Sequence, residues 1–429
     1  MIGPVGTSTR RAQWSWAFYD WANSAFATTV MAGFFPVFFK SYWAAGVPAT
    51  ESTMRLGSAN AIASMLVVLL APLLGVIADR SGRKKGLLLM LATLGVLMCG
   101  GLFLVAEGYW LVAAGLYVLG VIGFAGANVA YDAMLIDVAK KSELERVSAM
   151  GYALGYLGGG LLFALNVLMV LYPESFGLAD KTQAVRLAFL MVALWWAVFS
   201  LPVLLFVHEP PRPPAGKVLF HMRGAWRELA ESWRLLRSLP MAFVFLLAYW
   251  FYIDGVDTIV RMAVDYGLSL GFAAESLLTA LLITQLVGFP AALMFGRIGD
   301  RIGAKRAIWL ALLVYVIVVF WAWRMSASWE FYGIAVVIGL VQGGIQAMSR
   351  ALYARLIPAQ HAGRLFGLYN MMGKFAAVVG PLLVGWVTLL TDSSRTGILS
   401  VLLLFLVGAW LLSQVDVAQG ERDAARLEG

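Results

Sequence analysis

The sequence contains few charged residues, three histidines and one cysteine. Asp, Glu, Lys and Arg together make up 13% of the 429 residues, about half of the share that soluble globular domains carry. The single cysteine, Cys99, excludes a disulfide within the chain. The histidines fall outside the long apolar runs, and the sequence has no cluster of Cys and His. We therefore expect neither a metal site nor imidazole catalysis inside those runs.

Nucleotide- and nucleic-acid-binding signatures are missing as well. No glycine-rich loop of the GxxxxGK type, which cradles nucleotide phosphates, occurs in the sequence. The net charge of +8 arises from basic residues in short loops, without the stripe of Lys and Arg beside surface aromatics that marks nucleic-acid binding. We expect no cofactor, no nucleic-acid partner and no enzymatic activity.

Apolar residues are abundant: they make up 61% of the chain and give a mean hydropathy of +0.81. Because about 20 apolar residues cross a bilayer as a helix, we predict a multi-pass integral membrane protein whose surface contacts the lipid bilayer. The first run carries Asp20 and Asn23 and no small-residue cleavage site, so we expect it to be a retained first helix and not a signal peptide. The predicted spans cover residues 16–38, 57–78, 86–106, 110–134, 147–171, 186–207, 240–263, 276–298, 305–323, 330–352, 365–388 and 395–414.

Two loops of one pattern divide these twelve spans into halves. GVIADRSGRKK, from Gly75 to Lys85, and GRIGDRIGAKR, from Gly296 to Arg306, each follow the second span of their half. Asp132 and Asp137, at the end of the fourth span, likewise correspond to Arg350 and Arg355 at the end of the tenth. This duplication predicts an all-α membrane protein of two pseudo-symmetric six-helix bundles, residues 1–207 and 240–429, with a solute site between them.

Residues 208–239 are predicted to link the bundles on the cytoplasmic side. A cluster of prolines from Pro210 to Pro214 breaks helix, and Val218 to Leu236 then has the pattern of an amphipathic helix. Of the 32 Lys and Arg residues, 24 fall on the side of both termini and 7 on the other. Cationic loops are retained in the cytoplasm, so both termini are expected there, and the membrane is expected to be the plasma membrane of a bacterium.

Polar side chains inside the spans are the candidates for a transport pathway, because each is costly in hydrocarbon. They form stripes on the first, fourth, seventh and tenth spans. These stripes consist of Asp20, Asn23 and Ser24; Asn128, Tyr131 and Asp132; Asp254 and Asp257; and Gln342 and Gln346. The alternative is that the amides join helices and that Asp257 pairs with Arg261 one turn away.

Lys374 is the cation that lies well inside a span. We expect it to pair with Asp20 or Asp132 and so close the cytoplasmic side, or to meet an anionic group of the solute; a static ion pair is the alternative. The carboxylates of Asp20, Asp132, Asp254 and Asp257 are candidates for proton coupling, because making or breaking an ion pair moves a proton. Asp254 is nearest the midplane by count.

The repeated loops are predicted to act as gates. Asp79 is expected to cap the cytoplasmic N-terminus of a helix in the other half, and Arg83 to pair with Asp137. The gating candidates of the second half are Asp300, Arg301 and Arg350. Cytoplasmic retention by charge is the simpler alternative, although it does not account for the repeated glycines.

The motifs carry a family resemblance. GVIADRSGRKK resembles the signature between helices two and three of the major facilitator superfamily. FYDWANSAF at residues 18–26, FYIDGVDTI at 251–259, QGGIQAMSR at 342–350 and GLYNMMGKFAAVVGP at 367–381 resemble its vacuole effluxer-like branch, also called the unidentified major facilitator family. Tyr252 and Asn370 lie in these motifs and complete the candidate binding residues. The resemblance implies a small amino-acid-like solute, since fungal relatives are implicated in exporting amino acids from the vacuole.

Four positions depart from the family pattern. Asp132 stands where Asn is common, Ile136 where Pro is common, Ile253 where Asn is common, and Arg364 where an acidic residue is usual. We expect a monomeric secondary active transporter that couples protons to a small amino-acid-like solute. The alternatives are a translocator of lipids or amphiphiles, and a sensor without transport that would tolerate the loss of Asp254 and Lys374.

Overall fold

The computed structural model describes residues 9–209, 222–269 and 274–427, and these residues are almost entirely helical. Twelve helical stretches in this part of the chain are long and apolar enough to cross a membrane, which confirms the predicted spans. The first span consists of α1 (Arg10–Ala25), a π-helical segment (Phe26–Phe34), α2 (Phe35–Phe38) and a second π-helical segment (Phe39–Trp43).

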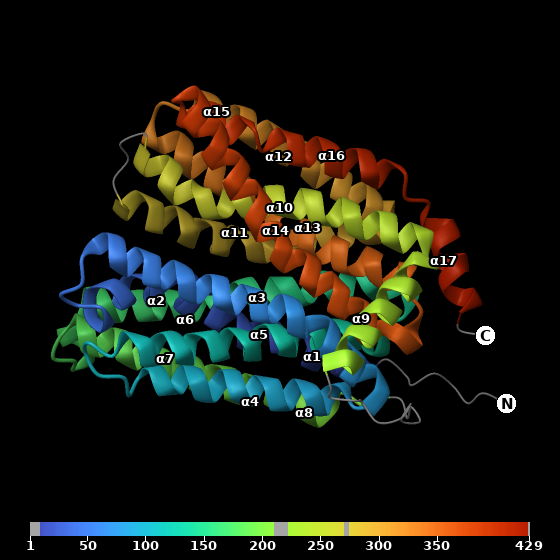
Figure 1. Ribbon diagram of the computed structural model, residues 1–429, viewed down its shortest axis with the longest axis horizontal. Coiled ribbons are helices and arrows are strands. Elements are labelled where there is room, and N and C mark those ends of the chain that lie inside the picture. The colour runs from blue at the N-terminus through green and yellow to red at the C-terminus, as the bar shows by residue number, and fades with distance from the viewer. Residues whose placement is uncertain (1–8, 210–221, 270–273, 428–429) are drawn as a thin grey trace.

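The remaining helices of the first lobe are α3 (Ala49–Ser81), α4 (Lys84–Leu102), α5 (Trp110–Val138), α6 (Leu144–Leu171), α7 (Lys181–Phe199) and α8 (Leu201–Phe206). The second lobe contains α10 (Pro240–Ser269), α11 (Ala274–Ile302), α12 (Ala304–Arg324), α13 (Ser328–Leu356), α14 (Ala362–Thr391), α15 (Ser394–Leu399) and α16 (Leu402–Ser413). The two lobes lie one above the other in Figure 1, the first in blue to green and the second in yellow to red.

Two helices outside the spans lie at the end of the molecule where both chain termini emerge (Figure 1). They are α9 (Met222–Arg237) and α17 (Val417–Arg426). We call this the termini end and the opposite one the far end. The predicted amphipathic helix is present from Met222 onward, whereas the preceding proline cluster lies outside the described residues.

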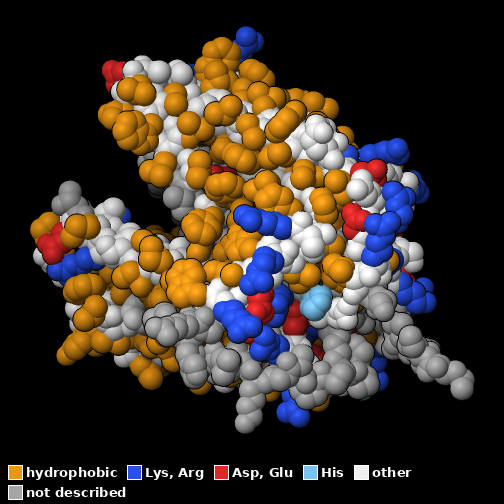
Figure 2. Space-filling view, turned by 45° about the vertical axis from the view of Figure 1, so that its right-hand side comes forward, with side chains coloured by type: hydrophobic (Ala, Val, Ile, Leu, Met, Phe, Trp, Pro, Cys, Tyr) orange, Lys and Arg blue, Asp and Glu red, His pale blue; other side chains and the backbone are white. Residues whose placement is uncertain are grey.

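The lobes meet along two seams, α3 against α14 and α6 against α11. At the far end a deep notch separates them in the space-filling view of Figure 2, whereas charged side chains cluster at the termini end. The outer surface is largely apolar, as a lipid-facing surface requires; Leu389 and Leu390, for example, are 79% and 76% exposed.

The repeated glycines have two separate physical reasons. Gly82 and Gly303 have φ angles of +62° and +85°, a conformation that glycine adopts without the steric cost a side chain imposes. Gly75 and Gly296 instead allow close helix contact between the lobes: a methyl group on Gly75 would lie 2.1 Å from the carbonyl oxygen of Gly363. The loop pattern therefore serves both to end a helix and to bring two helices together.

We predict that Gly75→Ala destabilises the protein, by about 1–3 kcal/mol, because overpacking a tight contact forces backbone shifts. Gly57→Ala is the matched control on the same helix, since nothing lies within 4 Å of the added methyl group and Ala favours helix over Gly. Thermal unfolding of both purified variants measures the difference. Equal melting temperatures of Gly75→Ala and Gly57→Ala would contradict a tight contact between Gly75 and Gly363.

Candidate functional site

Arg350 of α13 is buried between the lobes, with 2% of its surface exposed. Its guanidinium donates to Asp132 Oδ1 at 3.0 Å, and its Nη2 lies 3.4 Å from Asp20 Oδ2. It also donates to the hydroxyl and the carbonyl oxygen of Ser148, at 3.0 and 2.9 Å. Asp20, Asp132 and Ser148 come from α1, α5 and α6, so the ion pair joins one lobe to the other.

Three aromatic rings surround the same guanidinium. Its carbon atom lies 4.9 Å from the ring centre of Trp16, 5.3 Å from that of Tyr131 and 4.4 Å from that of Tyr152. Rings at these distances stabilise a cation through their negative faces. The sequence analysis did not identify Trp16 or Tyr152, because a single aromatic residue in an apolar span looks like core.

Polar contacts continue around the ion pair. Tyr131 donates its hydroxyl to Asp20 at 2.8 Å, and Asn370 of α14 donates to Asp132 at 2.9 Å. Asn23 and Asn128 bond to each other at 2.6 Å within the first lobe. The stripes on the first and fourth spans therefore contain both residues that join helices of one lobe and residues that reach the other lobe.

Glycines on α6 bring this helix close to α1. A methyl group on Gly151 would lie 2.6 Å from Asp20 Oδ2, and one on Gly155 would lie 2.6 Å from Ser24 Oγ. Small residues permit such approach of two membrane helices. The glycines thus hold the carboxylate of Asp20 within reach of Arg350.

Asp79 lies at the N-terminus of α14, as the sequence predicted. Its two carboxylate oxygens accept the backbone N–H groups of Gly363 and Arg364 at 2.8 and 2.7 Å, which satisfies donors that have no partner within the helix. In the second loop Asp300 accepts the backbone N–H of Arg146, near the start of α6. Both loops therefore reach from one lobe to a helix N-terminus of the other.

The predicted pair between Arg83 and Asp137 is wrong. Lys84 forms this pair, with its Nζ 2.8 Å from Asp137 Oδ2, while Arg83 is exposed. Arg83 is the residue just before α4, and adjacent residues point in different directions, so Lys84 and not Arg83 reaches Asp137. Arg301 is exposed too.

Two further charge clusters at the termini end escaped the sequence analysis. Arg355 bonds to Glu145 of α6 at 2.6 Å and to Glu421 of α17 at 3.3 Å. Glu228 of α9 pairs with Arg80 of the first lobe and with Arg364 of the second, the latter at 3.1 Å. Each cluster connects both lobes to a helix outside the membrane spans.

Asp254 and Tyr252 lie inside the second lobe. Asp254 is 1% exposed and both of its carboxylate oxygens accept the backbone N–H of Gly380 at 3.0 Å. The hydroxyl of Tyr252 bonds to that of Ser349 at 2.6 Å. The carboxylate of Asp254 therefore faces α14 within the second lobe, a direction that its depth in the span did not reveal.

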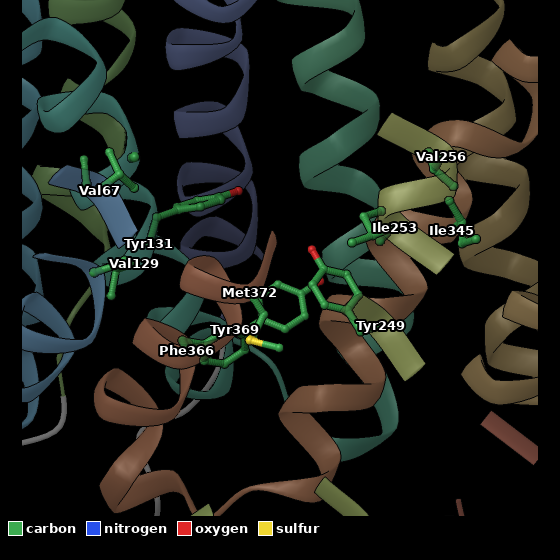
Figure 3. Close-up of a cluster of buried hydrophobic side chains, with 14 of the residues drawn as sticks. Val67, Val129, Tyr131, Tyr249, Ile253, Val256, Ile345, Phe366, Tyr369 and Met372 are labelled. Carbon is green, nitrogen blue, oxygen red and sulfur yellow. The ribbon is translucent and has the colours of Figure 1, made fainter. Parts of the chain in front are cut away.

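Four candidates are half-buried on helices of the second lobe, namely Asp257, Gln342, Gln346 and Lys374. Asp257 interacts electrostatically with Tyr152 and Tyr156 of the first lobe and with Tyr249 of the second, so it lies near the space between the lobes. Figure 3 shows the hydroxyls of Tyr131 and Tyr249 pointing toward one another from opposite lobes, with Tyr369 beside Tyr249. The side chain of Arg261 lies outside the described residues.

Lys374 was expected to pair with Asp20 or Asp132. The ion-pair partner of both carboxylates in the structure is Arg350, so that prediction assigned the contact to the wrong cation. A signal was available, because Asp132 and Arg350 occupy equivalent positions in the two halves. Equivalent residues near the axis that relates two repeats lie close together.

Comparison with known proteins gives the family. The family model described as "Vacuole effluxer Atg22 like" matches residues 50–143 and 136–425. The chain is 37% identical over 417 residues to the "Uncharacterized MFS-type transporter YxiO" of Bacillus subtilis (strain 168), covering 95% of this chain and 97% of that protein. It is 27% identical over 307 residues to autophagy-related protein 22-1 of Penicillium rubens, covering 66% of this chain and 51% of that protein, so it spans about half the length of this fungal relative.

Solved structures share the fold. The human organic anion transporter MFSD10 (TETRAN) superposes with a TM-score of 0.74 at 17% identity, covering 94% of this chain and 99% of that one. The proton:xylose symporter XylE gives a TM-score of 0.72 at 14% identity, covering 99% of each chain. With the family model matching both lobes, the chain belongs to the Atg22-like vacuole effluxer family, a branch of the major facilitator superfamily of membrane transporters.

Proposed function

We propose that the protein is a proton-coupled secondary transporter for a small amino-acid-like solute, acting as a monomer in a bacterial plasma membrane. The observation that carries this proposal is the burial of Arg350 from one lobe among carboxylates of the other. Such a contact can exist only while the termini end is closed. A transporter of two lobes needs a contact of this kind, made in one state and broken in the other.

The excess of Lys and Arg on the side of the termini supports a cytoplasmic termini end. The notch at the far end (Figure 2) then makes this the outward-facing state. Opening toward the cytoplasm requires the lobes to rock about their seams. It breaks the bonds of Asp79, Glu145 and Arg350 across the lobes.

Proton coupling follows from the charges in the buried site. Asp20 and Asp132 share one guanidinium, and the other titratable groups that face them are Tyr19, Tyr131 and Tyr152. Two carboxylates and one cation leave a net negative charge unless one carboxylate takes a proton, and Arg350 withdraws when the termini end opens. Because uncompensated buried charge is costly, the number of bound protons changes with the state of the lobes.

The half-buried residues of the second lobe supply groups for the solute. Asp257 suits an ammonium group, Lys374 a carboxylate, and Gln342 and Gln346 neutral polar groups. Together they match the two charged groups of an amino acid. The resemblance to vacuole effluxers also favours an amino-acid-like solute over a sugar or an amphiphile.

Asp132→Asn is expected to uncouple protons from the solute. In liposomes holding the purified protein, a proton gradient should drive accumulation of labelled amino acids and a protonophore should abolish it. At saturating solute, Asp132→Asn should retain solute exchange while losing at least tenfold of the gradient-driven accumulation, because one proton site is gone. Asp254→Asn removes a carboxylate bonded within one lobe and serves as control. Solute accumulation that is unchanged by the protonophore would contradict proton coupling. Transport of a fluorescent phospholipid without transport of any amino acid would favour a translocator of amphiphiles.

Asp79→Asn is expected to open the termini end more often. Removing a charge from a helix N-terminus weakens the contact by about 1 kcal/mol, which corresponds to an opening frequency about fivefold higher. A cysteine in place of Ala149, which faces Gly296 across the seam, reports opening through its rate of thiol labelling, since Cys99 is fully buried. The exposed Arg83→Gln is the control in the same loop, and equal labelling rates in all three proteins would refute the gate.

A further inference from the structure

The surroundings of Arg350 form a complete binding site within a single lobe. Its hydrogen-bond acceptors among the described residues are Asp20, Asp132 and Ser148, from α1, α5 and α6. The rings of Trp16, Tyr131 and Tyr152 come from the same three helices. The second lobe contributes the guanidinium itself. We call these six residues of the first lobe the cation box.

The cation box is held together by bonds that do not involve Arg350. Trp16 donates its indole N–H to the carbonyl oxygen of Tyr131 at 2.9 Å, and the two rings stack with centres 4.3 Å apart. Tyr131 in turn donates its hydroxyl to Asp20. These contacts all lie within the first lobe, so the box keeps its shape when the second lobe carries Arg350 away.

Withdrawal of Arg350 leaves acidic oxygens and ring faces without a cation. Protons neutralise the carboxylates but do not fill the space between the rings. A guanidinium fits both features, because its planar fork matches carboxylate oxygens and its face stacks on aromatic rings. An alkylammonium is attracted to the same carboxylates and rings as a point charge, but it has neither the planar fork nor a flat face that stacks.

We propose that the cation box binds the cationic side group of the transported solute and that this group is a guanidinium. The solute then competes for the box with Arg350, which belongs to the protein itself. The inference rests on the proposed transport function and specifies its substrate class. Solute enters the box when the termini end opens and Arg350 leaves. Closure returns Arg350 to the box and displaces the solute toward the space between the lobes. Protons and the cationic solute occupy the same two carboxylates in turn, so each expels the other.

The first experiment tests the box without transport. Arg350→Ala is purified and its melting temperature is measured with millimolar ethylguanidinium, with ethylurea as the neutral isostere and with ethylammonium. We expect ethylguanidinium to restore several degrees of stability and ethylurea to restore none. Arg355→Ala is the matched control, because Arg355 also pairs with two carboxylates and has no cation–ring contact among the described residues. Equal effects of the three compounds, or equal rescue of both variants, would overturn the proposal.

The second experiment tests the solute. L-arginine should stabilise the parent protein and exchange across liposomes, whereas L-citrulline, which is nearly the same shape without the charge, should do neither. Arginine affinity should weaken as the pH falls, and Asp132→Asn should lower it at least tenfold. Citrulline binding as tightly as arginine would overturn the inference. Transport of neutral amino acids without any binding of arginine would overturn this inference and leave the proposed transport function intact. If instead no solute is transported while ethylguanidinium still stabilises Arg350→Ala, the proposed transport function fails and the cation box stands.

Discussion

A buried guanidinium needs hydrogen-bond acceptors, and those that Arg350 has among the described residues all lie across the boundary between the lobes. Asp20, Asp132 and Ser148 provide the acceptors, and three rings replace the water that the cation loses. Such an arrangement is stable while it is complete and costly once one partner leaves. The two lobes bring Arg350 and these residues together in the closed state and separate them in the open state, in which the carboxylates of Asp20 and Asp132 remain without the guanidinium.

The contacts nearer the termini end are of a different kind. Asp79 bonds to backbone N–H groups, and Arg355 and Glu228 form ion pairs in which the carboxylate is buried and the guanidinium is partly exposed. A partly exposed partner keeps some of its water, so separating such a pair costs less than separating one in which both charges are fully buried. These contacts and the buried contact of Arg350 together hold the closed state.

Much of this architecture could be predicted from the sequence, since apolar length defines the spans and the repeated loops define two halves. The contact of Asp79 with a helix of the other half also followed from its position. The partners of charged residues did not, because neighbouring residues point about 100° apart around a helix axis: Lys84, not Arg83, meets Asp137. For the same reason the depth of Asp254 did not tell which neighbour it faces. The equivalence of Asp132 and Arg350 in the repeat was a usable signal for the central ion pair.

The central claim is that the Arg350 ion pair holds the termini end closed. Distances between spin labels at both ends test it directly, with one pair at Tyr109 and Trp329 of the far end and one at the exposed Arg83 and Arg301 of the termini end. Replacing Arg350 by Ala should shorten the first distance and lengthen the second, because the lobes then rock toward the opposite state. Unchanged distance distributions at both ends would contradict the account.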